Sequence, residues 1–256
     1  MPIHTEIDSD RRMGTVTIDR PGKRNALSRA MLAELREAFE TLPDADGDVR
    51  VLVVEGTDGI FSAGADIEEF KRRAGDPRAE TAYVDEIHET YEAVEDCPLP
   101  VVAKIPGPAV GAGCEIALAA DLRVASTNAS LALGEIDIGL VPPFERFMQY
   151  LGKARVRELC FTGEPLTADE EAARAVFNRI VPAAKLESAT AALVDTLAEK
   201  SPQALSTTKR ALRHAESTSK DGSIAYRKQL EYACFDHPDF EESIDAFVDG
   251  REPSYR

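Results

Sequence analysis

Two glutamates stand in apolar stretches of this sequence, where a charged side chain is costly. Glu115 lies in the middle of VGAGCEIALAADL (110–122), and Glu135 lies within LALGEIDIGLVPP (131–143). Burial disfavours the charged form of a carboxyl group unless the group is paired or needed for chemistry. The helix dipole alone explains one glutamate in a first helical turn. Two such glutamates, neither with a cationic neighbour in the sequence, suggest a pair of acid/base catalysts with raised pKa values.

Runs of small residues precede two expected helices and could bring backbone N–H groups close to a ligand. FSAGAD (61–66) places Gly64 and Ala65 before one helix, and GAGCE (111–115) places Gly111 and Ala112 before another. The first N–H groups of a helix have no intrahelical partner, and glycine allows close approach to the backbone. Each run alone is more simply a tight turn. Together they could form an oxyanion hole from two N–H groups that converge on one oxygen.

Strand and helix patterns alternate through the first three quarters of the chain, which predicts an α/β core with parallel strand pairing. Strands are expected at 14–19, 50–56, 99–107 and 121–126, and helices at 28–42 and 78–95. From about residue 185 only amphipathic helices are expected, at 185–199, 202–218, 221–235 and 239–249. We therefore expect a core at 1–195 and a helical region at 196–256 that packs on a neighbour or a partner subunit.

Composition restricts the class of protein. The 256 residues carry a formal net charge of −16, which argues against a nucleic-acid partner. No apolar run reaches the ~20 residues of a membrane span, and the N-terminus does not resemble a signal peptide, so we expect a cytoplasmic protein. The four cysteines are scattered and predict neither a disulfide framework nor a metal site. The dense negative charge also suggests adaptation to high salt.

Four segments, in their order and spacing, resemble the crotonase superfamily of enoyl-CoA hydratases and isomerases. They are RPGKRNALS (20–28), FSAGADIEEF (61–70), GPAVGAGCEIALAADLRVAS (107–126) and ALGEIDIGLVP (132–142). The resemblance extends to the closing helix, CFDHPDFEESIDAFVDGREPSY. It implies an α/β superhelix of ββα units with a C-terminal helical trimerisation region, assembled as a trimer or a dimer of trimers. It also implies an acyl-CoA thioester substrate and no separate cofactor, because coenzyme A is part of the substrate.

The same resemblance implies a role for each candidate site residue. The N–H groups of Ala65 and Ala112 would form the oxyanion hole, Glu115 would activate the attacking water, and Glu135 would exchange the proton at the α-carbon. The expected reaction is hydration of a 2-enoyl-CoA. The residues expected to bind substrate or coenzyme A are Lys23, Arg24, Ala26, Ala63, Gly64, Asp66, Ile67, Glu68, Gly111, Phe247 and Arg251.

Two departures from the family pattern bear on this expectation. Relatives usually continue past GLVP with a glycine-rich turn, whereas this chain has Pro143, Phe144, Glu145 and Arg146. Such a turn lies close to the reacting centre in the family, so bulky charged residues there are expected to reshape the acyl pocket or displace the water. Many relatives also offer a lysine to the coenzyme A of a neighbouring subunit, where this chain has Gly250, followed by Arg251.

Other functions remain open at this stage, because one fold hosts several chemistries. A double-bond isomerase needs only the carboxylate at Glu135 to move a proton. Decarboxylation or thioester hydrolysis would use the same oxyanion hole with the altered 143–146 turn. A non-enzymatic acyl-CoA binder, or a relative with an RNA-binding side role, is a further possibility. The pair of glutamates weighs against a binder, and the negative charge weighs against RNA.

Overall fold

The computed structural model describes residues 2–45 and 48–255, which form two sheets and ten α-helices in the described part of the chain. The main sheet has the strand order β1-β2-β3-β4-β6-β9, with β1 antiparallel to β2 and the other neighbours parallel. Its strands are β1 (Ile3–Asp8), β2 (Met13–Ile18), β3 (Val51–Gly56), β4 (Val101–Ile105), β6 (Leu122–Ser126) and β9 (Arg179–Val181). The smaller sheet contains β5 (Pro108–Val110), β7 (Ser130–Ala132) and β8 (Leu166–Thr167).

Helices follow most of the strands along the chain. They are α1 (Arg29–Thr41), α2 (Ile67–Arg73), α3 (Pro77–Asp96), α4 (Ala112–Ala119), α5 (Glu145–Tyr150), α6 (Lys153–Thr162), α7 (Leu186–Ala198), α8 (Pro202–Glu216), α9 (Lys220–Phe235) and α10 (Pro238–Asp249). Five short 3₁₀ helices are η1 (Pro21–Lys23), η2 (Leu42–Asp44), η3 (Gly134–Ile138), η4 (Glu171–Ala175) and η5 (Ala183–Lys185). The order β4-β5-α4 is one ββα unit of the kind that the resemblance implies, and β6-β7-η3 follows the same order with a 3₁₀ helix in the third place.

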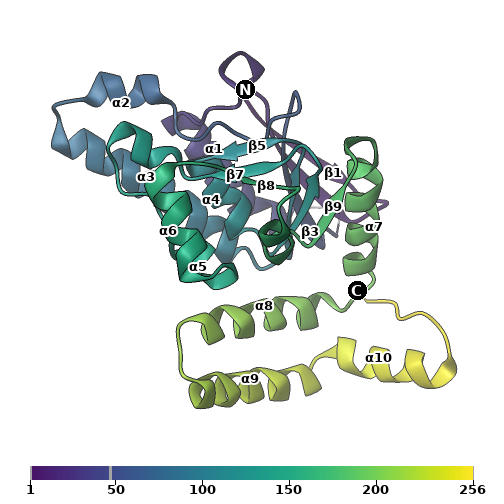
Figure 1. Cartoon of the computed structure of the whole chain (residues 1–256). Coiled ribbons are helices and arrows are strands. Elements are labelled where there is room, and N and C mark those ends of the chain that lie inside the picture. The colour runs from purple at the N-terminus through teal and green to yellow at the C-terminus, as the bar shows by residue number, and fades with distance from the viewer. Residues whose placement is uncertain (1, 46–47, 256) are drawn as a thin grey trace.

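Both faces of the main sheet are covered, which explains why β3 is a continuous apolar run. Val51 and Val53 pack with Leu193 and Val194 of α7 on one face. Leu52 and Val54 belong to the larger core on the other face, which includes residues of α1, α3 and α4. Because successive side chains of a strand point to opposite faces, the odd-numbered residues of β3 face α7 and the even-numbered residues face the larger core. Figure 1 shows α7 apart from α1, α3 and α4, with the sheet between them.

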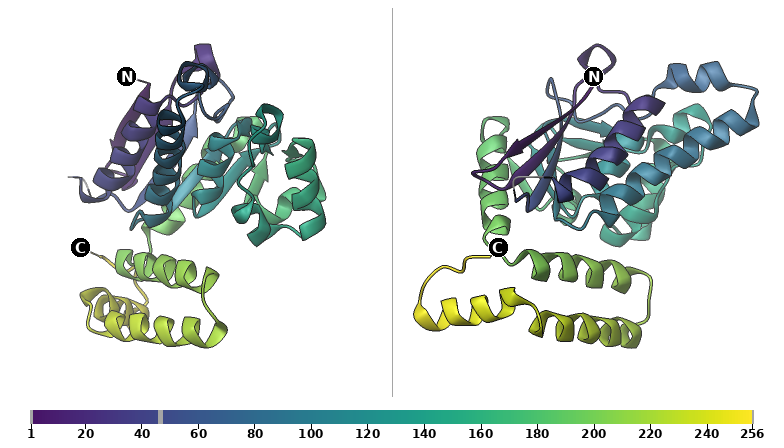
Figure 2. Two further views of the ribbon diagram at one scale, coloured as in Figure 1. Left: turned by 90° about the vertical axis from the view of Figure 1, so that its left-hand side faces the viewer. Right: turned by 180° about the vertical axis from the view of Figure 1, so that it is seen from behind.

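The last three helices leave the sheet and lie below it in Figures 1 and 2. The boundary expected at residue 195 falls inside α7, which packs on the sheet. The helices that leave the sheet begin at Pro202. The side chains of Phe247 and Val248 on α10 are 86% and 76% exposed. The two-part organisation and the packing of the helical part on a partner remain predictions. Within residues 2–45 and 48–255, no helix combines the length and apolar character needed to cross a membrane.

Candidate active site

The two runs of small residues lie side by side. Phe61 N donates to the Pro108 carbonyl at 3.0 Å, and Val110 N donates to the Ser62 carbonyl at 2.9 Å. These bonds make a parallel bridge that pairs Ser62 with Ala109. Further along, Gly64 lies against the start of α4, since a Cβ built on Gly64 would be 3.3 Å from Ala112 N. The sequence therefore brings the two backbone segments together through ordinary parallel pairing after β3 and β4.

Two glycines in the left-handed region turn these segments toward each other. Gly64 has φ +88° and Gly111 has φ +51°, conformations that residues with a side chain rarely adopt. A Cβ at Gly64 would lie 2.6 Å from the Val110 carbonyl oxygen and 3.3 Å from Ala112 N, so only glycine fits. Among the described residues, no acceptor receives a hydrogen bond from Ala65 N or Ala112 N. Two adjacent N–H groups are thus available to a ligand oxygen.

A cavity of about 470 Å³ opens directly at these N–H groups. Its wall is built by the two backbone segments, α3, η3 and the 140–145 segment that leads into α5. The wall is mainly apolar, with three carboxylates and a histidine. Its residues are Ala63, Gly64, Ala65, Ile67, Phe70, Val84, Ile87, His88, Tyr91, Val110, Gly111, Ala112, Gly134, Glu135, Asp137, Ile138, Leu140, Val141, Pro142, Pro143, Phe144 and Glu145. A largely apolar pocket with a few convergent polar groups is the usual form of a small-molecule site.

Glu135 lines this cavity from η3, next to the backbone of Gly111. A Cβ at Gly111 would lie 2.9 Å from Glu135 Oε1, so glycine is needed for the carboxylate to approach this closely. Its Oε2 atom is buried and has no hydrogen-bond partner among the described residues. Burial raises the pKa of Glu135 above its ordinary value, which favours a carboxyl group that can hold a proton.

Glu115 lies behind the cavity wall, in the first turn of α4, and is completely buried. Its Oε2 accepts a hydrogen bond from Arg146 Nη1 at 2.7 Å, whereas its buried Oε1 has no partner among the described residues. Burial raises the pKa of Glu115 to about 7, against the opposing effect of Arg146 and with a smaller contribution from the charge of Glu135. Glu115 N donates to the Gly111 carbonyl at 3.0 Å, and the Glu135 carboxylate approaches the same glycine, so both residues lie beside Gly111. Glu115 thus has a cationic partner that its sequence neighbourhood does not show.

Two further groups lie at the cavity, of which Tyr91 was not predicted from the sequence. Tyr91 of α3 is 2% exposed, and its pKa is raised well above the ordinary value, first by burial and then by the charges of Glu115 and Glu135. Glu145 adds a carboxylate to the wall, and its charge also raises the pKa of Glu115. Tyr91 falls in an ordinary amphipathic helix, so its sequence context contains no sign of a site. The 143–146 turn, by contrast, was expected to reshape the acyl pocket, and Pro143, Phe144 and Glu145 line the cavity.

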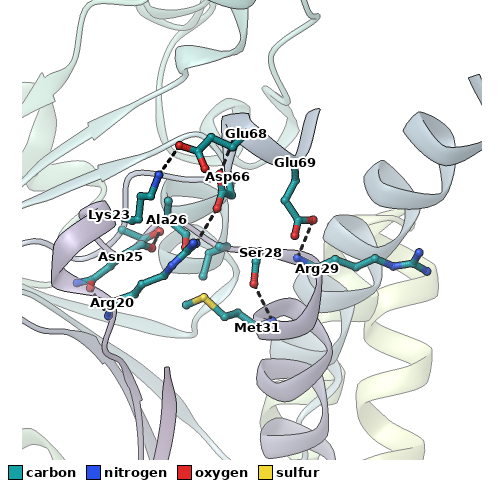
Figure 3. Close-up of polar contacts among 12 residues, drawn as sticks. Arg20, Lys23, Asn25, Ala26, Ser28, Arg29, Met31, Asp66, Glu68 and Glu69 are labelled. Atoms are coloured by element: carbon teal, nitrogen blue, oxygen red, sulfur yellow. Dashed lines mark hydrogen bonds and ion pairs between the residues drawn. The ribbon is translucent and has the colours of Figure 1, made fainter. Parts of the chain in front are cut away.

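The candidate coenzyme A residues fall into two groups. Ala63, Gly64, Ile67 and Gly111 line the cavity, and the remaining candidates do not. Lys23, on η1, forms an ion pair with Glu68 near the start of α2. Figure 3 shows this pair beside Asp66, whose carboxylate accepts hydrogen bonds from Glu68 N at 2.9 Å and from Arg20 at 2.8 Å.

These contacts cap α2 and fix the 20–28 loop against the wall of the cavity. Arg24 N–H bonds to the Pro21 carbonyl, and the Arg24 carbonyl accepts from Ala63 N at 3.0 Å. The Ala26 carbonyl accepts from Arg20 at 3.0 Å. The loop therefore holds Ala63 in the wall, while a direct contact of the loop with coenzyme A stays a prediction.

Two further candidates belong to the last helical segment and not to this cavity. Phe247 is highly exposed on α10, and Arg251, just after α10, pairs with Glu242 at 2.6 Å. Neither residue lines the cavity formed by the described part of the same chain. Their contribution to coenzyme A binding would have to reach a neighbouring subunit, and it remains a prediction.

Comparison with known proteins agrees with this architecture. The family described as enoyl-CoA hydratase/isomerase matches residues 9–256. A Bacillus subtilis protein named "Probable enoyl-CoA hydratase" is 32% identical over 251 residues, which cover 96% of each chain. The "2,3-dehydroadipyl-CoA hydratase" of Escherichia coli is 28% identical over 253 residues, covering 98% of this chain and 97% of that protein.

Solved structures of such proteins superpose on nearly every residue. The enoyl-CoA hydratase of Mycobacterium smegmatis has a TM-score of 0.93 at 28% identity and covers 100% of this chain and 99% of its own. The subunit I structure from Geobacillus kaustophilus has a TM-score of 0.91 at 30% identity, covering 100% of this chain and 98% of its own. The predicted α/β superhelix with C-terminal helices is confirmed.

Proposed function

Because the chain belongs to the enoyl-CoA hydratase/isomerase (crotonase) family, whose members act on acyl-CoA thioesters, we propose that it is an enoyl-CoA hydratase. It adds water across the double bond of a 2-enoyl-CoA thioester. The observation that carries this proposal is a pair of neighbouring carboxylates, each with one buried oxygen that lacks a partner among the described residues, next to two available N–H groups. A hydratase needs this combination: a base for water, an acid for the α-carbon and donors for the thioester oxygen.

Each group has one step in the proposed reaction. Glu115, ionised, takes a proton from the water as the water oxygen bonds to the β-carbon. The negative charge that develops on the thioester oxygen is stabilised by Ala65 N–H and Ala112 N–H. Glu135, protonated, then gives its proton to the α-carbon and completes the 3-hydroxyacyl-CoA. The raised pKa values of both glutamates suit proton transfer near neutral pH.

A second candidate function, double-bond isomerisation, is favoured by one observation. Glu135 lines the cavity, whereas Glu115 is enclosed behind its wall and bound to Arg146. An isomerase moves a proton between two carbons of the substrate and needs only the carboxylate of Glu135. Decarboxylation and thioester hydrolysis have no comparable observation in their favour. A homotrimer or dimer of trimers and a cytoplasmic location belong to the same proposal.

Turnover of crotonyl-CoA by the wild type and Glu115→Gln tests the proposal. We expect the wild type to consume the conjugated double bond, with a kcat that rises with pH through about 7, because the base must lose its proton. Glu115→Gln is expected to lower hydration by about 10²–10⁴-fold. Absorbance of the conjugated thioester measures the reaction, and exchange of the α-hydrogen of butyryl-CoA in D₂O is the internal control, since it should persist. Full hydration by Glu115→Gln would contradict the proposal, and isomerisation without hydration would favour the second candidate.

A further inference from the structure

Arg146, at the start of α5, bridges the buried carboxylate of Glu115 and the half-buried carboxylate of Glu95. Its Nη1 donates to Glu115 Oε2 at 2.7 Å, and its Nε donates to Glu95 Oε1 of α3 at 2.7 Å. The guanidinium carbon lies 5.2 Å from the centre of the Tyr91 ring, within the range of a cation–π contact. The hydrogen bonds to Glu115 and Glu95 and the contact with the Tyr91 ring together fix the orientation of the Arg146 side chain.

The guanidinium lies outside the candidate substrate cavity and packs against the ring of Tyr91, which is part of the cavity wall. Arg146 does not line the cavity that contains Glu135, whereas Arg146 and Glu95 line a second cavity of about 290 Å³ toward α8. Arg213 of α8 contacts the other oxygen of Glu95 at 3.4 Å. Glu115 is therefore the proposed catalytic group with which Arg146 makes a direct contact.

We propose that Arg146 is a positioning residue that favours the ionised form of Glu115 and orients its unpartnered oxygen toward the reacting centre. This inference rests on the proposed function, because it assigns Arg146 a task in the ionisation of the catalytic base. The bulky 143–146 turn, which replaces the glycine-rich turn usual in the family, would then supply an arginine to this base.

The charges around Glu115 explain why it needs such a partner. Glu135 of η3 and Glu145 of α5 both raise the pKa of Glu115, and Glu95 of α3 faces Arg146 from the other side. Tyr91 of α3 and Cys114 of α4 both have pKa values raised well above normal by burial, so they stay uncharged at neutral pH. Arg146 is the cation that lowers the pKa of Glu115 among these groups, and without it the carboxyl would keep its proton to a higher pH.

The test compares Arg146→Gln and Arg146→Lys with Arg155→Gln as the matched control. Arg155 also pairs with two glutamates, Glu158 at 2.7 Å and Glu170 at 2.6 Å, but it lies outside the substrate cavity. In Arg146→Gln we expect the acid limb of the kcat–pH profile to move up by at least about one unit, so that activity on that limb falls about tenfold. KM should change by less than about threefold, since Arg146 does not contact substrate. Lysine should recover part of the shift, and Arg155→Gln should leave the profile in place.

A second measurement does not depend on turnover. The infrared band of the protonated Glu115 carboxyl, identified by its loss in Glu115→Gln, reports the ionisation of that group directly. Its midpoint should move to higher pH in Arg146→Gln but not in Arg155→Gln. If the ionisation midpoint of Glu115 moves in Arg146→Gln but the wild-type protein does not hydrate crotonyl-CoA, the role of Arg146 is supported and the proposed hydratase activity is rejected. If Arg146→Gln instead loses activity equally at every pH, with the kcat–pH profile and the Glu115 midpoint unmoved, the inference is overturned even if the wild type hydrates crotonyl-CoA.

Discussion

Glu135→Gln is expected to lower kcat for crotonyl-CoA hydration by about 10²–10⁴-fold, because the α-carbon loses its proton donor. Glutamine has nearly the same shape as glutamate and cannot transfer a proton in this way. Glu135 lines the cavity beside Gly111, so the substitution changes the chemistry at the wall and leaves its form intact. Unlike Glu115→Gln, this variant should also lose exchange of the α-hydrogen of butyryl-CoA in D₂O, which NMR follows directly.

The control for this variant is Glu164→Gln, which removes the same charge from an exposed position after α6. It should leave hydration and exchange unchanged within about twofold, since surface substitutions away from structural features have small effects. If Glu135→Gln retained α-hydrogen exchange, the assignment of the α-carbon proton to Glu135 would be wrong. Both candidate reactions, hydration and isomerisation, would then need a different acid.

Gly64→Ala is expected to lower kcat by about 10²–10³-fold, the usual cost of losing one oxyanion donor. The added Cβ would lie 2.6 Å from the Val110 carbonyl oxygen and 3.3 Å from Ala112 N, so the two segments must move apart. Ala65 N and Ala112 N would then no longer reach the same oxygen. The loss should appear in kcat more than in KM, because the oxygen gains its charge only as the reaction proceeds.

Gly75→Ala separates this effect from backbone strain. Gly75 has the same φ of +88°, but nothing lies within 4 Å of a Cβ built there. Alanine in the left-handed region costs about 1–2 kcal/mol at either position. Gly75→Ala should lose about this much stability in denaturant unfolding, and Gly64→Ala should lose more, because its Cβ also clashes with the 110–112 segment. Only Gly64→Ala should lose activity. Equal activity of the two variants would show that the contact between Gly64 and the 110–112 segment is irrelevant to catalysis.

Local patterns were sufficient to predict most of the elements, because the apolar spacing reflects the faces that are buried. The expected helices at 185–199, 202–218, 221–235 and 239–249 correspond to α7 to α10 within a few residues. The strands β1, β5, β7, β8 and β9 were missed. The last four have two or three residues each, too short for an alternating pattern, and β1 is largely exposed.

The candidate site was predictable where its parts are continuous in the sequence. Ala65, Ala112 and Glu135 belong to short runs, and the structure brings these runs to one cavity. The partner of Glu115 was not predictable, since Arg146 is 31 residues away and reaches it from another helix. Tertiary contacts of this kind depend on how α3, α4 and α5 pack, and no local spacing encodes them.

The carbonyl stretch of a bound thioester measures the central claim most directly. Butyryl-CoA labelled with ¹³C at the thioester carbon cannot be hydrated, and isotope-edited infrared spectra isolate its carbonyl band in the complex. We expect the band to move to lower frequency in the wild type, because two N–H donors from Ala65 and Ala112 polarise the bond, and to return toward its solution value in Gly64→Ala. A wild-type complex whose thioester band stays at the solution frequency would contradict the account.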